Sequence, residues 1–527
     1  MKTQIDRRKV VSLIALGLAL SAPSVFAKNT PARQIDLDVR KADKPVDRFF
    51  DLSVGADFPG TTIRDANLAQ MKTTADELGF RYMRFHDIFA DDFGTVKMVD
   101  DKLVYDWTKI DYLYDHMLKS GIKPFVELGF TPDAIKTSDQ TIFYWKGNTS
   151  QPRLGLWKEV IDAFSRHLID RYGIDEVRSW YFEVWNEPNL SGFFQYGDKE
   201  AYFALYGVTA RTLKAVDPQL RAGGPSTAGA AWVPEFLANA KATNTPVDFI
   251  TTHTYGVDYG YLDEEGKMDL QLSKSPDAII GDVKKVRGEI EASHLPGIPL
   301  IFSEWSTSYN PRDLSHDSYI AAPYILSKLK GTQGIAQGMS YWVYSDLFEE
   351  PGPPGKAFEG GFGLMTKDGI RKSSWFAYKY LNALKGNEIP AADQQVWAAY
   401  DGSSVSAVVW DFQLPDQKGT SNGTFFSKLV PNKPSAPAKV KITGLKSGSY
   451  TVSVFRTGYK VNDAYSAYIA MGAPKDLTPA QLTQLQNLTT DRPETERTVS
   501  VGANGTAAIT LPMHSNDIVL VKLSAKP

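Results

Sequence analysis

The chain has no cysteine, which excludes disulfide bonds, thiolate metal sites and cysteine nucleophiles. Histidine is scarce as well. The seven histidines are scattered over 527 residues without an HExxH or HxH pair, which argues against a zinc centre. Neither sign of charge is in large excess, and the formal net charge of −3 argues against a nucleic-acid-binding surface. Apolar residues, in contrast, make up 43% of the chain, enough for a large core.

The N-terminus has the pattern of a signal peptide. Arg7, Arg8 and Lys9 precede an apolar run at 10–22 that is short for a bilayer span, and small residues end at Ala27. We therefore expect export to the periplasm or the medium, by the general secretory route or, given the Arg7-Arg8 pair, the twin-arginine route. No other stretch is apolar enough to cross a membrane, so we expect none in the mature protein.

Short apolar runs alternate with amphipathic stretches from about residue 50 to 384. Eight of the runs read as buried parallel strands, at 52–55, 82–85, 124–128, 180–184, 221–224, 249–252, 300–303 and 339–344. Helical patterns lie between them, at 65–78, 110–120, 156–172, 199–216, 276–292 and 373–384. Eight alternating units predict an α/β fold of the (β/α)8 TIM-barrel type. A doubly wound open sheet is the alternative, but no GxGxxG follows the first strand.

The pattern of apolar and polar residues changes after residue 384. Runs at 405–414, 438–442, 450–455 and 518–523 are rich in β-forming residues and separated by Gly and Ser turns, which predicts an accessory antiparallel β-sandwich. The alternating segment 34–39 is expected to pair with it, and the polar segment 416–437 is expected to be a surface loop. The predicted domains are therefore a signal peptide at 1–27, a joining segment at 28–49, a barrel at 50–385 and a sandwich at 386–527.

Two carboxylates directly follow predicted barrel strands. Glu187 comes after the fourth strand in Trp-Asn-Glu-Pro-Asn, and Glu304 comes after the seventh in Ser-Glu-Trp. Alone, Glu187 could be a helix-capping residue and Glu304 an ion-paired strand end. Together they fit the hydrolysis of a glycoside with retention of configuration, which needs one protonated and one ionised carboxyl about 5–5.5 Å apart. The strand ends of a barrel converge on its active site, so we predict Glu187 as the acid/base and Glu304 as the nucleophile. We also expect repulsion from Glu304 to raise the pKa of Glu187.

The sequence resembles family 39 of the glycoside hydrolases, which belongs to clan A. The best-known members of this family are β-xylosidases and α-L-iduronidases. The resemblance is carried, in order along the barrel, by Arg84-Phe85-His86, Trp185-Asn186-Glu187-Pro188-Asn189-Leu190, His253-Thr254-Tyr255, Phe302-Ser303-Glu304-Trp305, Tyr341-Trp342-Val343-Tyr344-Ser345-Asp346, Phe348-Glu349-Glu350 and Gly360-Gly361-Phe362-Gly363-Leu364. It implies a barrel with an accessory sandwich, a carbohydrate substrate, and no metal or other cofactor.

The resemblance also implies roles for neighbours of the two glutamates. Asn186 is expected to hydrogen-bond the sugar 2-hydroxyl, a contact that strengthens in the transition state. Arg84 is expected to lie beside Glu304, since a nearby cation favours the ionised carboxylate. Tyr255 is expected to donate to Glu304 and orient it.

Further residues are assigned to the walls of the site in the same way. His86 and His253 are expected to offer neutral imidazole groups to ring hydroxyls. Trp342 at the end of the eighth strand is expected to form the floor under the sugar, and Phe193 one wall.

The loops after the eighth strand bear on which sugar is cut. Glu349 and Glu350 are expected to reach hydroxyls on the far side of the sugar. Glu359 departs from the family pattern, which has His there, and the loop 351–355 is rich in proline. The leading interpretation is an exo-acting β-1,4-xylosidase that releases xylose from xylo-oligosaccharides by double displacement. The alternatives are a related family 39 enzyme with another sugar or with endo action on an exopolysaccharide, and a non-catalytic carbohydrate-binding protein.

Overall fold

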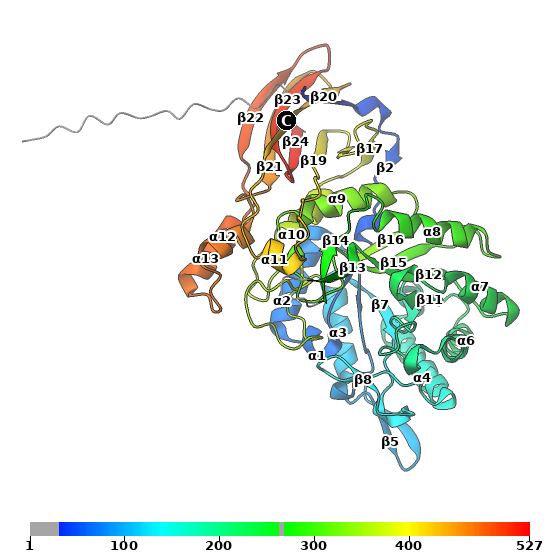
Figure 1. Ribbon diagram of the computed structural model, residues 1–527. Helices are drawn as coiled ribbons and strands as arrows, with labels where there is room; N and C mark the ends of the chain where they lie inside the picture. Colours follow the sequence, from blue (N-terminus) through cyan, green and yellow to red (C-terminus); the bar gives the residue numbers. More distant parts are fainter. Residues whose placement is uncertain (1–30, 263–267, 527) are drawn as a thin grey trace, which may run out of the picture.

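The computed structural model describes residues 31–262 and 268–526 (Figure 1). The predicted signal peptide, residues 1–27, lies outside the described residues. Within the described part of the chain, no helix has the length and apolar character needed to cross a bilayer.

Eight parallel strands close into a barrel in the order β10-β11-β12-β15-β16-β3-β4-β7. Their bounds are β3 Ser53–Gly55, β4 Tyr82–Phe85, β7 Lys123–Leu128, β10 Tyr181–Val184, β11 Arg221–Thr227, β12 Phe249–Tyr255, β15 Leu300–Ser306 and β16 Gly338–Tyr341. Each predicted strand overlaps one of these eight. The (β/α)8 fold class is therefore confirmed, and the open doubly wound sheet is rejected by the closed strand order.

Helices surround the barrel as an outer layer (Figure 1). The main ones are α2 Asp65–Leu78, α3 Thr108–Lys119, α4 Leu154–Tyr172, α6 Lys199–Val216, α7 Val233–Ala242, α8 Ile280–Glu291, α9 Ala321–Thr332 and α10 Ser373–Asn382. Helix α4 shows why they form, because Trp157, Ile161, Phe164 and Leu168 recur at helical spacing and are fully buried. Helix α8 starts later than predicted, since Ile279 has a left-handed backbone (φ 69°) that keeps residues 276–279 out of the helix.

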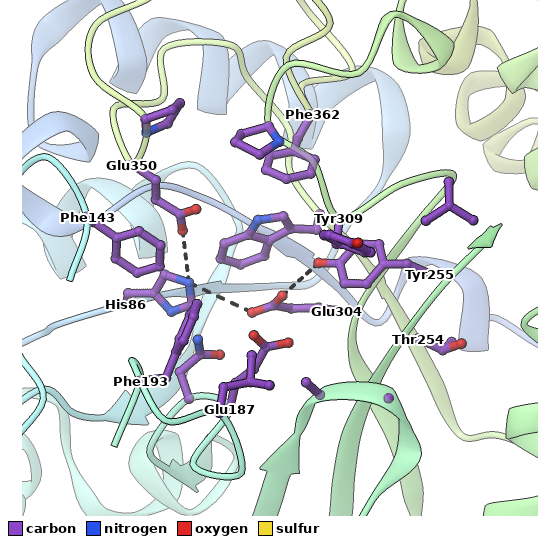
Figure 2. A pocket seen from close by; sticks show the side chains of 18 of the residues that line it. His86, Phe143, Glu187, Phe193, Thr254, Tyr255, Glu304, Tyr309, Glu350 and Phe362 are labelled. Atoms are coloured by element: carbon purple, nitrogen blue, oxygen red, sulfur yellow. Dashed lines mark hydrogen bonds and ion pairs between the residues drawn. The ribbon is translucent and has the colours of Figure 1, made fainter. Parts of the chain in front are cut away.

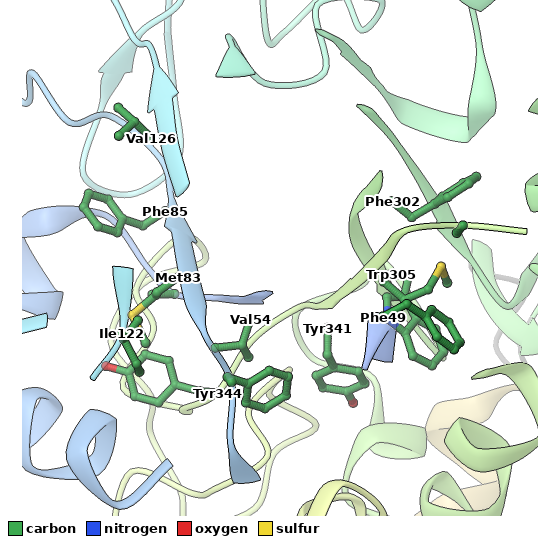
Figure 3. Packing of buried hydrophobic residues seen from close by; sticks show 14 of the residues in the cluster. Phe49, Val54, Met83, Phe85, Ile122, Val126, Phe302, Trp305, Tyr341 and Tyr344 are labelled. Carbon is green, nitrogen blue, oxygen red and sulfur yellow. The ribbon is translucent and has the colours of Figure 1, made fainter. Parts of the chain in front are cut away.

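Successive side chains of each strand point alternately toward the inside and the outside of the barrel. Outward residues such as Phe85 and Val126 join the large cluster between strands and helices (Figure 3). Inward residues at the amino ends of the strands form a separate apolar plug that includes Leu52, Phe125, Phe249 and Ile301. Each of these plug residues contributes about 1.5–3 kcal/mol by burial. The plug closes the bottom of the barrel, so only its carboxyl end is left to hold a site.

The N-terminal strand and the C-terminal region build two further sheets. One has three strands in the order β1-β20-β23, and the other has seven in the order β2-β17-β18-β19-β24-β21-β22. The bounds are β1 Arg33–Asp38, β2 Lys44–Pro45, β17 Asn387–Ile389, β18 Val396–Tyr400, β19 Ser404–Trp410, β20 Pro434–Thr443, β21 Gly448–Thr457, β22 Thr495–Val501, β23 Ala507–His514 and β24 Ile518–Ala525. An apolar cluster with residues from both sheets lies between them. The strand β1 pairs with β20 in parallel, whereas the pairs within the C-terminal region are antiparallel.

The expectation of a surface loop at 416–437 is wrong in part. The segment contains the short helix α11 (Asn422–Phe426) and packs onto loops of the barrel. Asn422 is fully buried, accepts a hydrogen bond from the amide of Leu272 at 3.0 Å and donates to Asp313 at 2.8 Å. The buried side chains of Gln417 and Asn422 satisfy the amide of Leu272 in those loops, whereas other polar residues of the segment, such as Lys418 and Lys428, face water. Two more helices, α12 (Ala464–Ala470) and α13 (Pro479–Leu488), interrupt the β-rich region.

Candidate active site

The carboxyl ends of the barrel strands enclose a cavity of about 730 Å³ (Figure 2). Glu304 lies on β15, and Glu187 lies in the turn just after β10. Trp185 and Glu187 in that turn have left-handed backbones, with φ of 71° and 46°. Such conformations are unfavourable for these residue types, and they turn the chain sharply so that the Glu187 carboxyl enters the cavity.

The two carboxyl groups face each other across the bottom of the cavity. One oxygen of Glu187, one of Glu304 and a ring nitrogen of His253 all lie within 4.8 Å of one another. Carboxyl oxygens this close fit retaining glycosidases, whose two carboxyl groups are about 5–5.5 Å apart, better than inverting ones, in which the groups are roughly 6.5–9.5 Å apart. The pair can therefore act as a nucleophile and an acid/base on opposite sides of one bond.

Glu304 receives a donor on each oxygen. The guanidinium of Arg84 donates to Oε1 at 2.7 Å, and the hydroxyl of Tyr255 donates to Oε2 at 2.8 Å (Figure 2 labels Tyr255 and Glu304). Both contacts are those that the sequence predicted. A cation and a hydroxyl at these distances favour the ionised carboxylate and fix its plane.

The surroundings of Glu187 favour the protonated form of its carboxyl. Burial raises the pKa of the Glu187 carboxyl to about 7, so the group keeps its proton near neutral pH. The direction of this pKa change agrees with the expectation, but the stated cause was wrong, because burial and not repulsion from Glu304 dominates. Cations at Arg84 and His86 offset part of the rise.

Arg84 holds a group of inward carboxylates together below the cavity floor. Besides Glu304, it contacts Glu183 at 2.5 Å and Glu127 at 2.8 Å, and all these groups are buried. It also donates to Oδ1 of Asn186 at 2.9 Å. Asn186 lines the cavity, so its amide nitrogen is the part left to meet a sugar hydroxyl.

The two predicted histidines differ from the expectation and from each other. His86 lines the cavity and contacts Glu127 at 2.8 Å and Glu350 at 3.2 Å. Burial lowers the pKa of His86, but these carboxylates outweigh it and raise the pKa well above 6.5, so the ring is a cation and not a neutral imidazole. His253 is neutral, since burial lowers its pKa to about 4. It is not among the residues that line the cavity, but lies behind Glu187, with Nδ1 at 2.9 Å from Oε1.

The neighbouring residues Glu349 and Glu350 point in different directions. Glu350 lines the cavity beside His86 (Figure 2), and burial raises its pKa to about 7. Glu349 instead pairs with Arg64 at 2.5 Å and is not among the lining residues, so the structure does not bring it to the cavity, where it was expected to reach sugar hydroxyls. A loop has no periodicity from which the orientation of two adjacent side chains could be read.

Aromatic side chains form much of the cavity wall. Trp342 follows β16 directly and lines the cavity with Phe193, as the sequence predicted. Phe143 and Tyr309 line it as well but lie in loops that the sequence motifs did not single out, and Phe362, which also lines it, belongs to a motif but was given no role. Flat apolar faces of this kind stack on sugar rings.

Glu359 does not line the cavity but braces the proline-rich loop that does. Its carboxylate lies 3.2 Å from Arg312 and accepts from the amide of Gly355 at 2.9 Å, and Arg312 donates to the carbonyl of Gly352 at 3.1 Å. Pro351 of this loop lines the cavity. The departure from the family pattern at Glu359 therefore affects one wall of the site through the loop.

Three polar residues of the inner layer were missed. Glu127 and Glu183 lie within the apolar runs of β7 and β10, and Ser303 directly precedes Glu304 on β15. For the two glutamates the sequence did offer a signal, because a charged side chain inside a buried strand needs a buried partner. For Ser303 it offered none.

Glu187, His253 and Glu304 are also, among the described residues, the group whose geometry could hold a metal ion. Each already has another role, because Glu304 is neutralised by Arg84 and Glu187 contacts the ring of His253. A second cation beside the guanidinium would be repelled, so the arrangement suits acid/base chemistry better than metal binding.

Comparisons with known proteins agree with this geometry. The family described as "Glycosyl hydrolases family 39" matches residues 33–508. The β-xylosidase of Geobacillus stearothermophilus is 38% identical over 377 residues, which cover 69% of this chain and 74% of that protein. Two solved structures are similar over nearly the whole fold. The GH39 enzyme from Xanthomonas axonopodis pv. citri is 59% identical with a TM-score of 0.94, over 96% of this chain and 100% of that one. A monomeric β-xylosidase from Caulobacter crescentus CB15 is 62% identical with a TM-score of 0.93, over 94% of this chain and 100% of that one.

Proposed function

This chain belongs to family 39 of the glycosyl hydrolases, and on that basis we propose that it is a retaining, exo-acting β-1,4-xylosidase that releases xylose from xylo-oligosaccharides. The observation that carries the proposal is the pair Glu187 and Glu304, with carboxylate oxygens within 4.8 Å of each other at the bottom of an aromatic cavity. Two of the compared proteins are β-xylosidases, which supports the choice of sugar.

The first half of the reaction breaks the glycosidic bond. Glu187 is protonated near neutral pH because burial raises its pKa to about 7, and it gives this proton to the leaving oxygen. The carboxylate of Glu304, oriented by Arg84 and Tyr255, attacks the anomeric carbon as the bond to that oxygen breaks. The products are a free leaving-group alcohol and a covalent xylosyl ester of Glu304.

The second half releases the sugar. Glu187 is now a carboxylate and takes a proton from a water molecule on the face that the leaving group has left. The water oxygen attacks the anomeric carbon, the ester bond to Glu304 breaks, and Glu187 is protonated again. Two inversions at the same carbon give net retention.

The walls of the cavity support a short substrate. His86 provides a cationic partner and Glu350 a carboxyl partner for ring hydroxyls, and Trp342 provides a flat surface in the same cavity. A pentose lacks the exocyclic hydroxymethyl group, so a close-packed wall there would favour xylose. The discrimination against a hexose is only about 1–3 kcal/mol when a pocket merely lacks room, so weak activity on other sugars is expected.

We also propose that the enzyme acts outside the cytoplasm. The support is the basic segment Arg7–Lys9, the apolar run at 10–22 and the small-residue site ending at Ala27. Cell fractionation and N-terminal sequencing of the mature protein test this, with a first residue of Lys28 expected. A full-length protein in the cytoplasm would contradict it.

The substrate test compares kcat/KM on xylobiose, cellobiose and long xylan, with proton NMR of the anomeric signals during the reaction. We expect xylobiose to be the best substrate and β-xylose to appear before α-xylose. If polymers are cut internally and xylobiose is untouched, the endo-acting alternative replaces the exo-xylosidase. An α-anomer formed first would reject retention.

A further inference from the structure

A chain of buried polar groups runs from the inside of the barrel to the acid/base. Ser303 Oγ lies 2.6 Å from Glu183 Oε1, His253 Nε2 lies 3.2 Å from Ser303 Oγ, and His253 Nδ1 lies 2.9 Å from Glu187 Oε1. Glu183, Ser303 and His253 are fully buried. They come from β10, β15 and β12, so the chain exists only in the folded barrel.

The direction of each hydrogen bond follows from a count of protons. Burial raises the pKa of Glu183, but its neighbours, Arg84 foremost, together outweigh burial and lower the pKa overall, so Glu183 is a carboxylate that can only accept. The single hydroxyl proton of Ser303 is therefore given to Glu183 at 2.6 Å. Ser303 Oγ can then only accept from its other neighbour, the Nε2 atom of His253.

This count fixes the tautomer of His253. The ring is neutral, since burial lowers its pKa to about 4, and it has one N–H. The proton on Nε2 is donated to Ser303, which leaves a lone pair on Nδ1, facing Glu187 at 2.9 Å. The hydroxyl of Ser226 is the competing partner of Nε2, but it is more distant, at 3.4 Å.

We propose that Glu183 and Ser303 act as positioning residues that hold His253 in the Nε2–H tautomer, so that Nδ1 accepts the proton of Glu187 and keeps this acid protonated between turnovers. The inference rests on the proposed role of Glu187. An acceptor beside the carboxyl stabilises its protonated form and disfavours the carboxylate. The same lone pair makes the Glu187 carboxylate a stronger base when it takes a proton from water in the second half-reaction.

Other charged groups also act on Glu187 and His253. They are Glu304, whose Oε2 lies 3.5 Å from His253 Nδ1, together with Arg84, His86, Glu127 and Glu183. The titratable residues Asp282 and Glu350 line the same cavity as Glu187. Replacing Ser303 by alanine changes none of these charges. Its effect on the titration of Glu187 therefore reports on the hydrogen-bond chain.

The first experiment measures kcat/KM against pH for Ser303→Ala, with phenyl β-xyloside, whose leaving group needs protonation. Without Ser303 Oγ, the ring is free to take its proton on Nδ1 and donate it to Glu187, which favours the carboxylate. We expect the alkaline limb to move to lower pH by about one unit, the scale of one hydrogen bond to a charged group, with activity at low pH largely kept. Ser303→Thr keeps a hydroxyl and should restore the limb.

The matched control is Ser340→Ala on β16. This serine is also buried in a barrel strand, but its hydroxyl has no hydrogen-bond partner. Its pH profile should equal that of the wild type. An unchanged limb in Ser303→Ala, or a shift in Ser226→Ala without one in Ser303→Ala, would overturn the proposal.

The second experiment reads the tautomer directly in the unaltered enzyme. Nitrogen-15 NMR of histidine-labelled protein distinguishes Nε2–H from Nδ1–H, and a His253→Gln variant assigns the signal among the seven histidines. A neutral Nε2–H ring at pH 6 is expected, and an Nδ1–H ring would refute the inference. This result does not depend on the substrate, so it stands even if the enzyme cleaves another β-glycoside than a xyloside.

Discussion

The buried state of Glu187 costs stability, and this cost can be measured. A rise in the pKa of this carboxyl from 4.5 to about 7 corresponds to about 3 kcal/mol, since each pKa unit is worth about 1.4 kcal/mol. Below the unfolded pKa of about 4.5 the carboxyl is protonated in both states, and no cost arises. As the pH rises above this value, the unfolded chain ionises first and gains free energy. The full penalty is reached above pH 7, where the folded carboxyl is ionised too.

Glu187→Gln removes this penalty, because an amide has nearly the shape of the protonated carboxyl and does not titrate. The variant should therefore be more stable than the wild type at pH 8, by up to about 3 kcal/mol, with the difference shrinking to about zero near pH 4. For a barrel of this size the difference corresponds to a rise in Tm of about 3–6 °C. Its kcat on substrates with poor leaving groups should fall by about 10²–10⁴-fold.

The assay is Tm of both proteins by scanning calorimetry from pH 5 to pH 9 at one scan rate. Glu235→Gln, an exposed position on α7, is the control and should show a difference in Tm that is small at every pH. The wild-type kcat/KM should also decline as the pH rises above about 7, because the acid is then ionised. A Glu187→Gln variant that is no more stable at pH 8 than at pH 5, relative to the wild type, would refute the burial argument.

Three further outcomes are expected. Glu304→Ala should lower kcat by on the order of 10⁵-fold, and added azide should give the glycosyl azide of inverted configuration, seen by NMR; near wild-type turnover would reject the nucleophile. Arg84→Met should destabilise the fold by about 3–5 kcal/mol, because the buried carboxylates lose their cation. The loss should be larger at pH 8 than at pH 5, and calorimetry that shows no pH dependence would contradict this. Glu350→Gln should lower kcat/KM on xylobiose by at least about tenfold, because this carboxyl lines the cavity. Glu349→Gln, at a position outside the cavity, should change kcat/KM by less than about twofold. Equal losses in the two variants would place both side chains at the substrate.

Much of the barrel follows from local pattern. The apolar runs that precede Glu187 and Glu304 are bounded by turn residues, and each forms a strand. Parallel strands of a barrel converge at their carboxyl ends whatever their exact bounds, so a carboxylate after two such strands was enough to find the pair. The contacts of Glu304 with Arg84 and Tyr255 could be expected because the residues belong to a set of motifs in the right order.

The charge states needed the tertiary structure. His86 is a cation because Glu127 and Glu350 arrive from other parts of the chain, and no sequence neighbour of His86 indicates this. Glu187 holds its proton because of burial, a property of the whole barrel end. Electrostatic effects of this kind depend on the distance between groups in space and on the exclusion of water. No repeating pattern in the sequence reports either quantity.

The sequence by itself determined the fold class, the two opposed carboxylates and the reaction they can perform, because strand and helix periods and strand-end positions are local features. Only the tertiary structure decided which side chains line the cavity. It placed Glu350 in the cavity and turned Glu349 outward, and it moved His253 behind the acid. Loops have no repeating geometry, and the partners of a buried polar group are fixed by packing between distant strands.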